Sequence, residues 1–367
     1  MSWSFRIGRI AGTDVKVHVT FLLLLAWIAL SSRADGGTSA AIGSVIAMLA
    51  LFGCVLLHEF GHIFAAKRYG IHTPDVILLP IGGVARLSRI PEEPRQEIVI
   101  ALAGPAVNLV IVAAISAGLA LSGDAPWQAI RHPFAAIEGP PLVSLMAVNL
   151  LLLVFNLAPA FPMDGGRVLR ALIAMRLPYV RATRAAARVG QMLAMVGGMY
   201  GFLHQPMDIS LMLVAAFVFL AAGAEAAAVE TRAAGRGVTV SQMMVTDFRT
   251  LRVYATIADA VALLLAGEQR EFPVVDNLGH VEGMLTRDHL IQGLTHHGPQ
   301  ATVSEAMATG VPQVSPQLGF GEALSVLRAS RLPALPVVDP AGALVGMLTM
   351  DNVTDLLLVR RAQEGVA

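Results

Sequence analysis

Six apolar stretches dominate the first part of the 367-residue chain. Each approaches the roughly 20 apolar residues that a helix needs to cross the hydrocarbon core of a bilayer. No comparable stretch follows Val229, so we expect a six-helix membrane domain over residues 1–230 and a C-terminal part of mixed polarity. The first run lacks a convincing small-residue cleavage site and should remain as a helix. The runs are Val17 to Ser32, Ala41 to Ala66, Ile98 to Ser122, Leu142 to Phe161, Val189 to Leu203 and Ile209 to Val229.

The positive charges between these runs predict their orientation. If the N-terminus is cytoplasmic, every Lys and Arg up to Arg236 falls on the cytoplasmic side except Arg33 and Arg131. This asymmetry is the one that loops of membrane proteins show. A bundle of five or seven crossings would scatter the same charges over both faces. We therefore expect a multi-pass protein of the cell membrane, embedded in the lipid bilayer, with both termini cytoplasmic.

Charge and cysteine content restrict the function classes. Charged residues make up 14% of the chain, which is low for a soluble enzyme. Lys plus Arg and Asp plus Glu number 26 each, so no basic field is available for nucleic acid. Cys54 is the single cysteine, which excludes a disulfide framework and a thiolate cluster. Any metal site must therefore use histidines and carboxylates.

The C-terminal part contains two consecutive copies of one pattern, which align without a gap. Pro273-Val-Val-Asp276 recurs as Pro336-Val-Val-Asp339, and Gly283-Met-Leu-Thr286 recurs as Gly346-Met-Leu-Thr349. Each copy predicts an apolar helix, a buried strand, an Asp-containing turn, a second strand and a second helix. This α+β pattern resembles a tandem pair of CBS domains, a Bateman module. The expected bounds are 231–238 for a linker, 239–301 for the first CBS domain and 302–364 for the second.

Four residues of the repeat suggest a ligand site. Thr286 and Thr349 would begin helices, where hydroxyl and backbone N–H groups suit a phosphate. Asp288 and Asp351 follow two residues later, where they could accept hydrogen bonds from ribose hydroxyls. The resemblance implies an adenine nucleotide at these positions, ATP in the first place, and a homodimer formed through the module. The alternative is that both threonines are N-caps and both aspartates are ordinary first-turn charges.

The sequence His58-Glu59-Phe60-Gly61-His62 lies inside the second apolar run. On a helix, histidines at i and i+4 share one face, so one divalent ion could take both imidazoles. Glu59 would lie alongside, where it could take the proton of a water molecule on that ion. Ionisable side chains inside a membrane-spanning helix are costly, which favours a functional site. The alternative is a hydrogen-bonded histidine pair that packs between helices.

A catalytic zinc site needs a third protein ligand. The stretch Asn156-Leu-Ala-Pro159-Ala-Phe-Pro162-Met-Asp164-Gly165-Gly166 follows the fourth run, and Asp164 is our candidate. In the six-helix topology, His62 and Asp164 both lie about 5 to 15 Å from the cytoplasmic face at about 1.5 Å per residue. The alternative is an inner-leaflet aspartate paired with Arg167 or Arg170.

These motifs, together with Gly104-Pro105-Ala-Val-Asn108 in the third run, resemble the site-2 protease family of intramembrane zinc metalloproteases. The tail makes the chain similar to the subclass with C-terminal CBS domains. The resemblance implies Zn²⁺ bound by His58, His62 and Asp164, with Glu59 as catalytic base and acid. It also implies that Asn156 is a polar donor near the scissile carbonyl.

The resemblance further implies a substrate class. The expected reaction is cleavage of a transmembrane or membrane-adjacent segment, after an earlier cut has shortened the substrate. The expected partner is a membrane protein such as an anti-sigma factor or a membrane-tethered transcription regulator. Two other functions remain open at this point. One is a CBS-regulated channel or transporter, which would have no use for the His-Glu-x-x-His spacing, and the other is a membrane-bound peptidase of soluble peptides.

The segment from Val76 to Val84 is apolar, but it is too short and too rich in Gly and Pro to cross a bilayer as a helix. We expect a re-entrant hairpin beside the metal site, whose open strand could pair with an unwound substrate. The alternative is an ordinary cytoplasmic loop that lies on the membrane.

Overall fold

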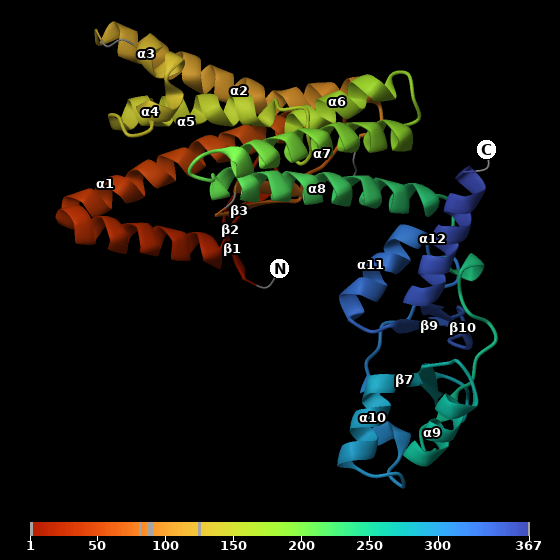
Figure 1. The fold of residues 1–367 in the computed structure, drawn as a ribbon. Helices are drawn as coiled ribbons and strands as arrows, with labels where there is room; N and C mark the ends of the chain where they lie inside the picture. The colour runs from red at the N-terminus through yellow and green to blue at the C-terminus, as the bar shows by residue number, and fades with distance from the viewer. Residues whose placement is uncertain (1–2, 81, 87–90, 124–125, 366–367) are drawn as a thin grey trace. The chain divides into compact units, whose positions relative to one another are not determined.

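The chain is described by a computed structural model over residues 3–80, 82–86, 91–123 and 126–365 (Figure 1). It is mostly helical and forms two compact units, Met1–Ala227 and Ala228–Ala367. Ile81 of the expected hairpin and Arg89 of the charge pattern lie outside the described residues.

The first two apolar runs share one long element, α1, of 50 residues. This helix is bent at Gly37, whose φ of 76° and ψ of −165° are not helical, and Figure 1 shows the chain folding back at the bend. Glycine adopts such a positive φ without the steric penalty that a Cβ brings. The helices of this unit are α1 Val19–Arg68, α2 Pro94–Leu121, α3 Pro126–Arg131, α4 Pro133–Ala136, α5 Pro141–Asn156, α6 Asp164–Ala174, α7 Tyr179–Leu203 and α8 Ile209–Ala234.

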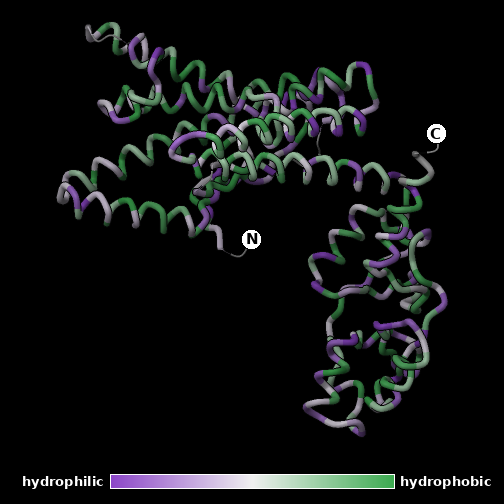
Figure 2. Tube along the Cα trace, viewed as in Figure 1, coloured by the Kyte–Doolittle hydropathy of each residue, from purple (hydrophilic) through white to green (hydrophobic). Residues whose placement is uncertain are grey.

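Among the described residues, α1, α2 and α8 are long and apolar enough to cross a membrane. Apolar residues predominate along them (Figure 2), and many large apolar side chains on them point outward. Exposed apolar surface of this extent is typical of a protein that contacts lipid. Examples are Leu23, Trp27, Ile46, Val110 and Leu220, all at least 60% exposed.

A four-stranded sheet lies against α1, in the order β1 (Ser4–Ile10), β2 (Thr13–His18), β3 (Asp75–Leu79) and β4 (Gly82–Arg86). The antiparallel pairing of β3 with β4 confirms that this segment forms a hairpin. The hairpin of β1 and β2 was not expected, and β2 runs parallel to β3.

Side chains of a strand alternate between the two faces of its sheet, and one face of this sheet packs against α1. Val15, Val17, Val76 and Leu78 are buried against aromatic and apolar side chains of α1. Charged side chains alternate with these valines, and Lys16 Nζ lies 2.7 Å from Asp75 Oδ2. This packing holds β4 beside the second arm of α1.

The sequence repeat corresponds to a repeat of helices and strands in the second unit. Equivalent elements start at equivalent positions of the two copies, as β6 and β9 do at Glu271 and Ala334. The elements are β5 Leu251–Arg252, α9 Ile257–Ala266, β6 Glu271–Val275, β7 Val281–Thr286, α10 Arg287–His296, β8 Ala308–Thr309, α11 Phe320–Ser330, β9 Ala334–Val338, β10 Leu344–Thr349 and α12 Met350–Gly365.

The two copies exchange their first segments. Val240 and Met243 of the first copy lie in the apolar core built mainly from the second copy. Correspondingly, Val303 lies in the core of the first copy. The strands pair across the copies as well, since β8 at the start of the second copy pairs with β7 of the first. Neither copy can therefore complete its core without the other.

Candidate metal centre

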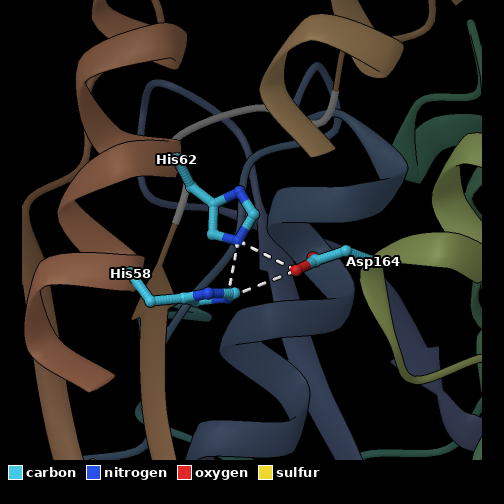
Figure 3. A group of neighbouring side chains, drawn as sticks. All are labelled: His58, His62 and Asp164. Carbon is cyan, nitrogen blue, oxygen red and sulfur yellow. Dashed lines mark hydrogen bonds and ion pairs between the residues drawn. The ribbon is translucent and has the colours of Figure 1, made fainter. Parts of the chain in front are cut away.

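The two histidines lie on the second arm of α1, one turn apart, and both are buried (Figure 3). Their rings meet edge to face with centroids 4.8 Å apart. Both Nε2 atoms point in the same direction, as the spacing of the two histidines predicts.

Asp164 reaches the histidines from a tight loop that follows α5. The loop ends where α6 begins, so Asp164 is the first residue of that helix and is buried. The backbone folds back closely, because a Cβ on Gly165 would lie 2.3 Å from the carbonyl oxygen of Leu157. A Cβ on Gly166 would similarly clash with the backbone of Ala160 at 2.6 Å. Glycine at both positions therefore allows the turn that presents Asp164.

The three side chains form a small triangle of ligand atoms. His62 Nε2 lies 3.1 Å from His58 Nε2 and 3.1 Å from Asp164 Oδ2, and His58 Nε2 lies 3.3 Å from the same oxygen. Ligands about 2.0–2.1 Å from a tetrahedral zinc ion are separated by about 3.3 Å. Two imidazoles and one carboxylate also match the donor set of catalytic zinc sites. These residues could therefore hold zinc with only a small expansion of the triangle.

Two acceptors on α2 orient the imidazoles. His58 Nδ1 donates to Asn108 Oδ1 at 2.9 Å, and His62 Nδ1 donates to the carbonyl oxygen of Ile100 at 2.7 Å. Because each Nδ1 carries a proton, each Nε2 keeps its lone pair free for a metal. From the sequence, Asn108 was recognisable only as part of a family motif, and no pattern pointed to the carbonyl of Ile100.

A third residue of α2, Gly104, makes room for the histidine rings. A Cβ at this position would lie 2.2 Å from His62 Nε2 and 2.7 Å from His58 Nε2. The backbone of α2 thus passes directly beside the two ligand atoms. The sequence contains Gly104 in a recognisable motif, but its function follows only from the distance to the histidines.

Glu59 lies next to the histidines and is half-buried. It also contacts β4, because a Cβ on Gly83 would lie 2.6 Å from Glu59 Cγ. The carboxylate therefore lies close to β4, the outer strand of the sheet.

Asn156 and Arg170 are the other two polar residues considered from the sequence. Asn156 is the last residue of α5, and within the described part of the chain no hydrogen bond joins it to the metal centre. Arg170 does not pair with Asp164, because its guanidinium donates to Glu97 and Glu225. The alternative of an Asp164 paired with Arg170 is therefore wrong.

The predicted nucleotide residues of the tail divide into two groups. The hydroxyls of Thr286 and Thr349 accept the backbone N–H groups of His289 and Asn352, so both cap helices. Asp288 and Asp351 are exposed and line separate clefts.

The two clefts have volumes of about 450 and 650 Å³, and Arg270 and Arg287 line both of them. Burial and the nearby carboxylates of Asp351 and Asp288 raise the pKa of Glu271, which lines the smaller cleft. Arginine and carboxylate side chains thus lie together along this region. The two arginines were not predicted as site residues from the sequence.

We predict that Gly104→Ala removes metal from the protein, because the added methyl group would occupy the space of the two Nε2 atoms. The expected loss of zinc affinity is at least about tenfold, as for changes around other metal ligands. Zinc content and chelator competition measure it. Gly118→Ala on the same helix is the control, since its Cβ would meet no atom within 4 Å. Equal zinc affinity in the two variants would contradict the prediction.

Comparison with known families agrees with this geometry. Residues 46–139 and 134–197 match peptidase family M50, and residues 240–296 and 303–359 match the CBS domain. The peptidase match contains both histidines and Asp164, and the CBS match covers both copies of the repeat.

Relatives that match most of the chain are named as zinc metalloproteases. Zinc metalloprotease MJ0392 of Methanocaldococcus jannaschii is 34% identical over 278 residues, which are 76% of each chain. Putative zinc metalloprotease Rip3 of Mycobacterium tuberculosis is 30% identical over 388 residues, covering 97% of this chain and 93% of that protein. The solved site-2 protease from M. jannaschii is 36% identical, with a TM-score of 0.43 over 61% of this chain and 95% of that one. By sequence and by motif, the chain belongs to peptidase family M50, the site-2 protease family of zinc metalloproteases, and carries a tandem pair of CBS domains.

Proposed function

We propose that the chain is an intramembrane zinc endopeptidase that cleaves a transmembrane or membrane-adjacent segment of a membrane protein. The observation that carries this proposal is a buried triangle of His58, His62 and Asp164. The two histidines and Glu59 lie on α1, an apolar helix long enough to span a bilayer, and Asp164 lies at the start of α6. A channel or transporter gains nothing from this arrangement. A peptidase of soluble peptides would not need its histidines buried in such a helix.

The proposed roles follow from the chemistry of the side chains. His58, His62 and Asp164 would bind zinc, which when bound acts as a Lewis acid toward the scissile carbonyl and the attacking water. Glu59 would take a proton from that water and deliver it to the leaving amine. Asn156 would donate a hydrogen bond to the scissile carbonyl once substrate is bound.

The proposed topology has six membrane-spanning segments. The bend at Gly37 divides α1 into two of them, and α2, α5, α7 and α8 would supply the others. The distribution of Lys and Arg supports cytoplasmic termini. The proposed boundaries are 1–230 for the membrane domain, 231–238 for a linker, and 239–301 and 302–364 for the CBS domains. The proposed substrate is an anti-sigma factor or a membrane-tethered transcription regulator.

We predict that Glu59→Gln lowers cleavage by about 10²- to 10⁴-fold while zinc remains bound, because the carboxylate transfers protons and does not coordinate the metal. Asp164→Ala should lose both zinc and activity. Metal analysis and a cleavage assay on purified variants distinguish the two roles. Near-normal turnover by Glu59→Gln, or full zinc content in Asp164→Ala, would contradict the assignment.

We propose that the substrate pairs with the open edge of β4. Among the described strands β4 pairs only with β3, and its Gly83 contacts Glu59. A substrate segment must unwind, since a helix keeps its amides in internal hydrogen bonds. An extended segment paired along β4 would expose its amides next to Glu59.

Proline substitution in β4 tests this pairing. Neighbouring residues of an antiparallel strand direct their N–H groups to opposite sides, so one of Val84 and Ala85 donates toward β3 and the other toward the open edge. We predict that one of Val84→Pro and Ala85→Pro lowers stability, whereas the other keeps zinc and stability but cleaves about tenfold more slowly. Wild-type cleavage by both zinc-loaded variants would argue against strand pairing.

The tail is proposed to bind an adenine nucleotide and to join two copies of the chain. Planar guanidinium groups such as those of Arg270 and Arg287 suit phosphate oxygens. Asp288 and Asp351 have exposed carboxylates that could accept hydrogen bonds from ribose hydroxyls. A nucleotide could regulate cleavage only if it binds two arrangements of the protein with different affinities.

We predict that ATP binds the full-length protein and changes the cleavage rate by about 5- to 150-fold. Titrations with ATP, ADP and AMP that follow binding and cleavage together measure the effect. Asp351→Ala should weaken binding, whereas Asp355→Ala, on the same helix but outside both clefts, should not. An unchanged cleavage rate at saturating nucleotide would leave the tail as a dimerisation or docking module.

A further inference from the structure

Arg170 is the largest side chain that is fully buried in the described structure, with an exposed fraction of 1%. Its Nε donates to Glu97 Oε1 at 2.9 Å, and Nη2 donates to the same oxygen. Nη1 donates to Glu225 Oε1 at 2.7 Å. The guanidinium carbon also lies 5.0 Å from the ring centroids of Phe161 and Tyr179.

These contacts connect Arg170 to both sides of Asp164. Phe161 belongs to the tight loop before Asp164, and Arg170 follows Asp164 by six residues on α6. The first turn of α6 has no side-chain cap, and two of its first three residues are glycines. Side chains other than Asp164 therefore provide little to fix this turn. Farther along α6, Leu169 and Ile173 supply apolar packing, and Arg170 supplies the ion pairs that attach the helix to its surroundings.

The partner of Arg170 lies on the same face of α2 as the groups that orient the histidines. Glu97, Ile100, Gly104 and Asn108 recur at helical spacing, and all four are buried. Glu97 is one turn before Ile100, whose carbonyl oxygen accepts from His62. The ion pair of Arg170 with Glu97 therefore joins the helix of Asp164 to the turn of α2 that orients His62.

Burial of this ion pair is not an efficient way to stabilise a fold. Removing charged groups from water is costly, and well-packed apolar residues often stabilise equally well. An arginine that donates through several N–H groups instead fixes geometry, because its planar donors restrict both the distance and the angle to a carboxylate.

We propose that Arg170 is a positioning residue that locks α6 onto α2 and so sets the distance from the Asp164 carboxylate to the two imidazoles. Glu97 is its main partner, and Glu225 attaches the same guanidinium to α8. This inference rests on the proposed role of His58, His62 and Asp164 as metal ligands. It assigns to Arg170 no contact with substrate or metal.

The experiment compares Arg170→Lys, Glu97→Gln and the double variant Arg170→Met/Glu97→Gln in the full-length protein. Zinc affinity is measured by chelator competition, and ligand geometry by the visible absorption spectrum of the Co²⁺-substituted protein. We expect zinc affinity to fall about tenfold or more, the cobalt spectrum to change, and kcat to fall more than KM rises. Arg176→Lys, which alters an exposed arginine just beyond α6, should leave all of these unchanged.

The double variant keeps the test valid if single variants fold poorly, because it removes both buried charges together. Native zinc affinity and an unchanged cobalt spectrum in the folded double variant would overturn the proposal, even if its melting temperature fell. Asp164→Ala in the same assay distinguishes a wrong metal site from a wrong role for Arg170. If Asp164→Ala kept zinc, the proposed metal site would be wrong; if it lost zinc while the Arg170 variants did not, only the positioning role would fail.

Discussion

The close contact between α1 and α2 is the constraint on which the rest of the metal centre depends. Gly61 on α1 has no room for a Cβ, which would lie 2.6 Å from the carbonyl oxygen of Ala103, and Gly104 has none beside the histidine rings. This approach lets acceptors on α2 reach both Nδ1 atoms, so that the two Nε2 atoms face Asp164. A buried imidazole without such partners would be a costly polar group among apolar side chains. The packing of α1 against α2 therefore also sets the orientation of the two histidine rings.

Residues related by local periodicity could be predicted from the sequence. His58 and His62 share a helix face because they are four residues apart, and α1 places them so. The internal repeat of the tail likewise predicted the equivalent strands β6 and β9. Asp164 lies 102 residues beyond His62. It was predicted from its place in the Pro- and Gly-rich stretch after the fourth apolar run, and the depth expected from a six-helix topology agreed with that choice.

Features that depend on contacts between distant segments could not be predicted. The strand β2 is short and merges into the apolar run that follows, although Val15 and Val17 alternate with charged residues in the way a half-buried strand does. The partners of Arg170 lie 73 and 55 residues away, and no pattern in the chain pairs them. The repeat defines two copies in sequence, whereas each apolar core takes its first segment from the other copy. The sequence repeat is the same whether or not the copies exchange these segments, so the repeat cannot predict the exchange.

Two imidazoles and one carboxylate are proposed to hold a zinc ion in the membrane domain. X-ray absorption spectroscopy at the zinc edge of the purified full-length protein identifies the ligand atoms. We predict nitrogen and oxygen ligands at about 2.0–2.2 Å, with scattering from two imidazoles that disappears together with the metal in a His58→Ala/His62→Ala variant. A sulfur ligand at about 2.3 Å, or an unchanged spectrum in the doubly substituted protein, would contradict it.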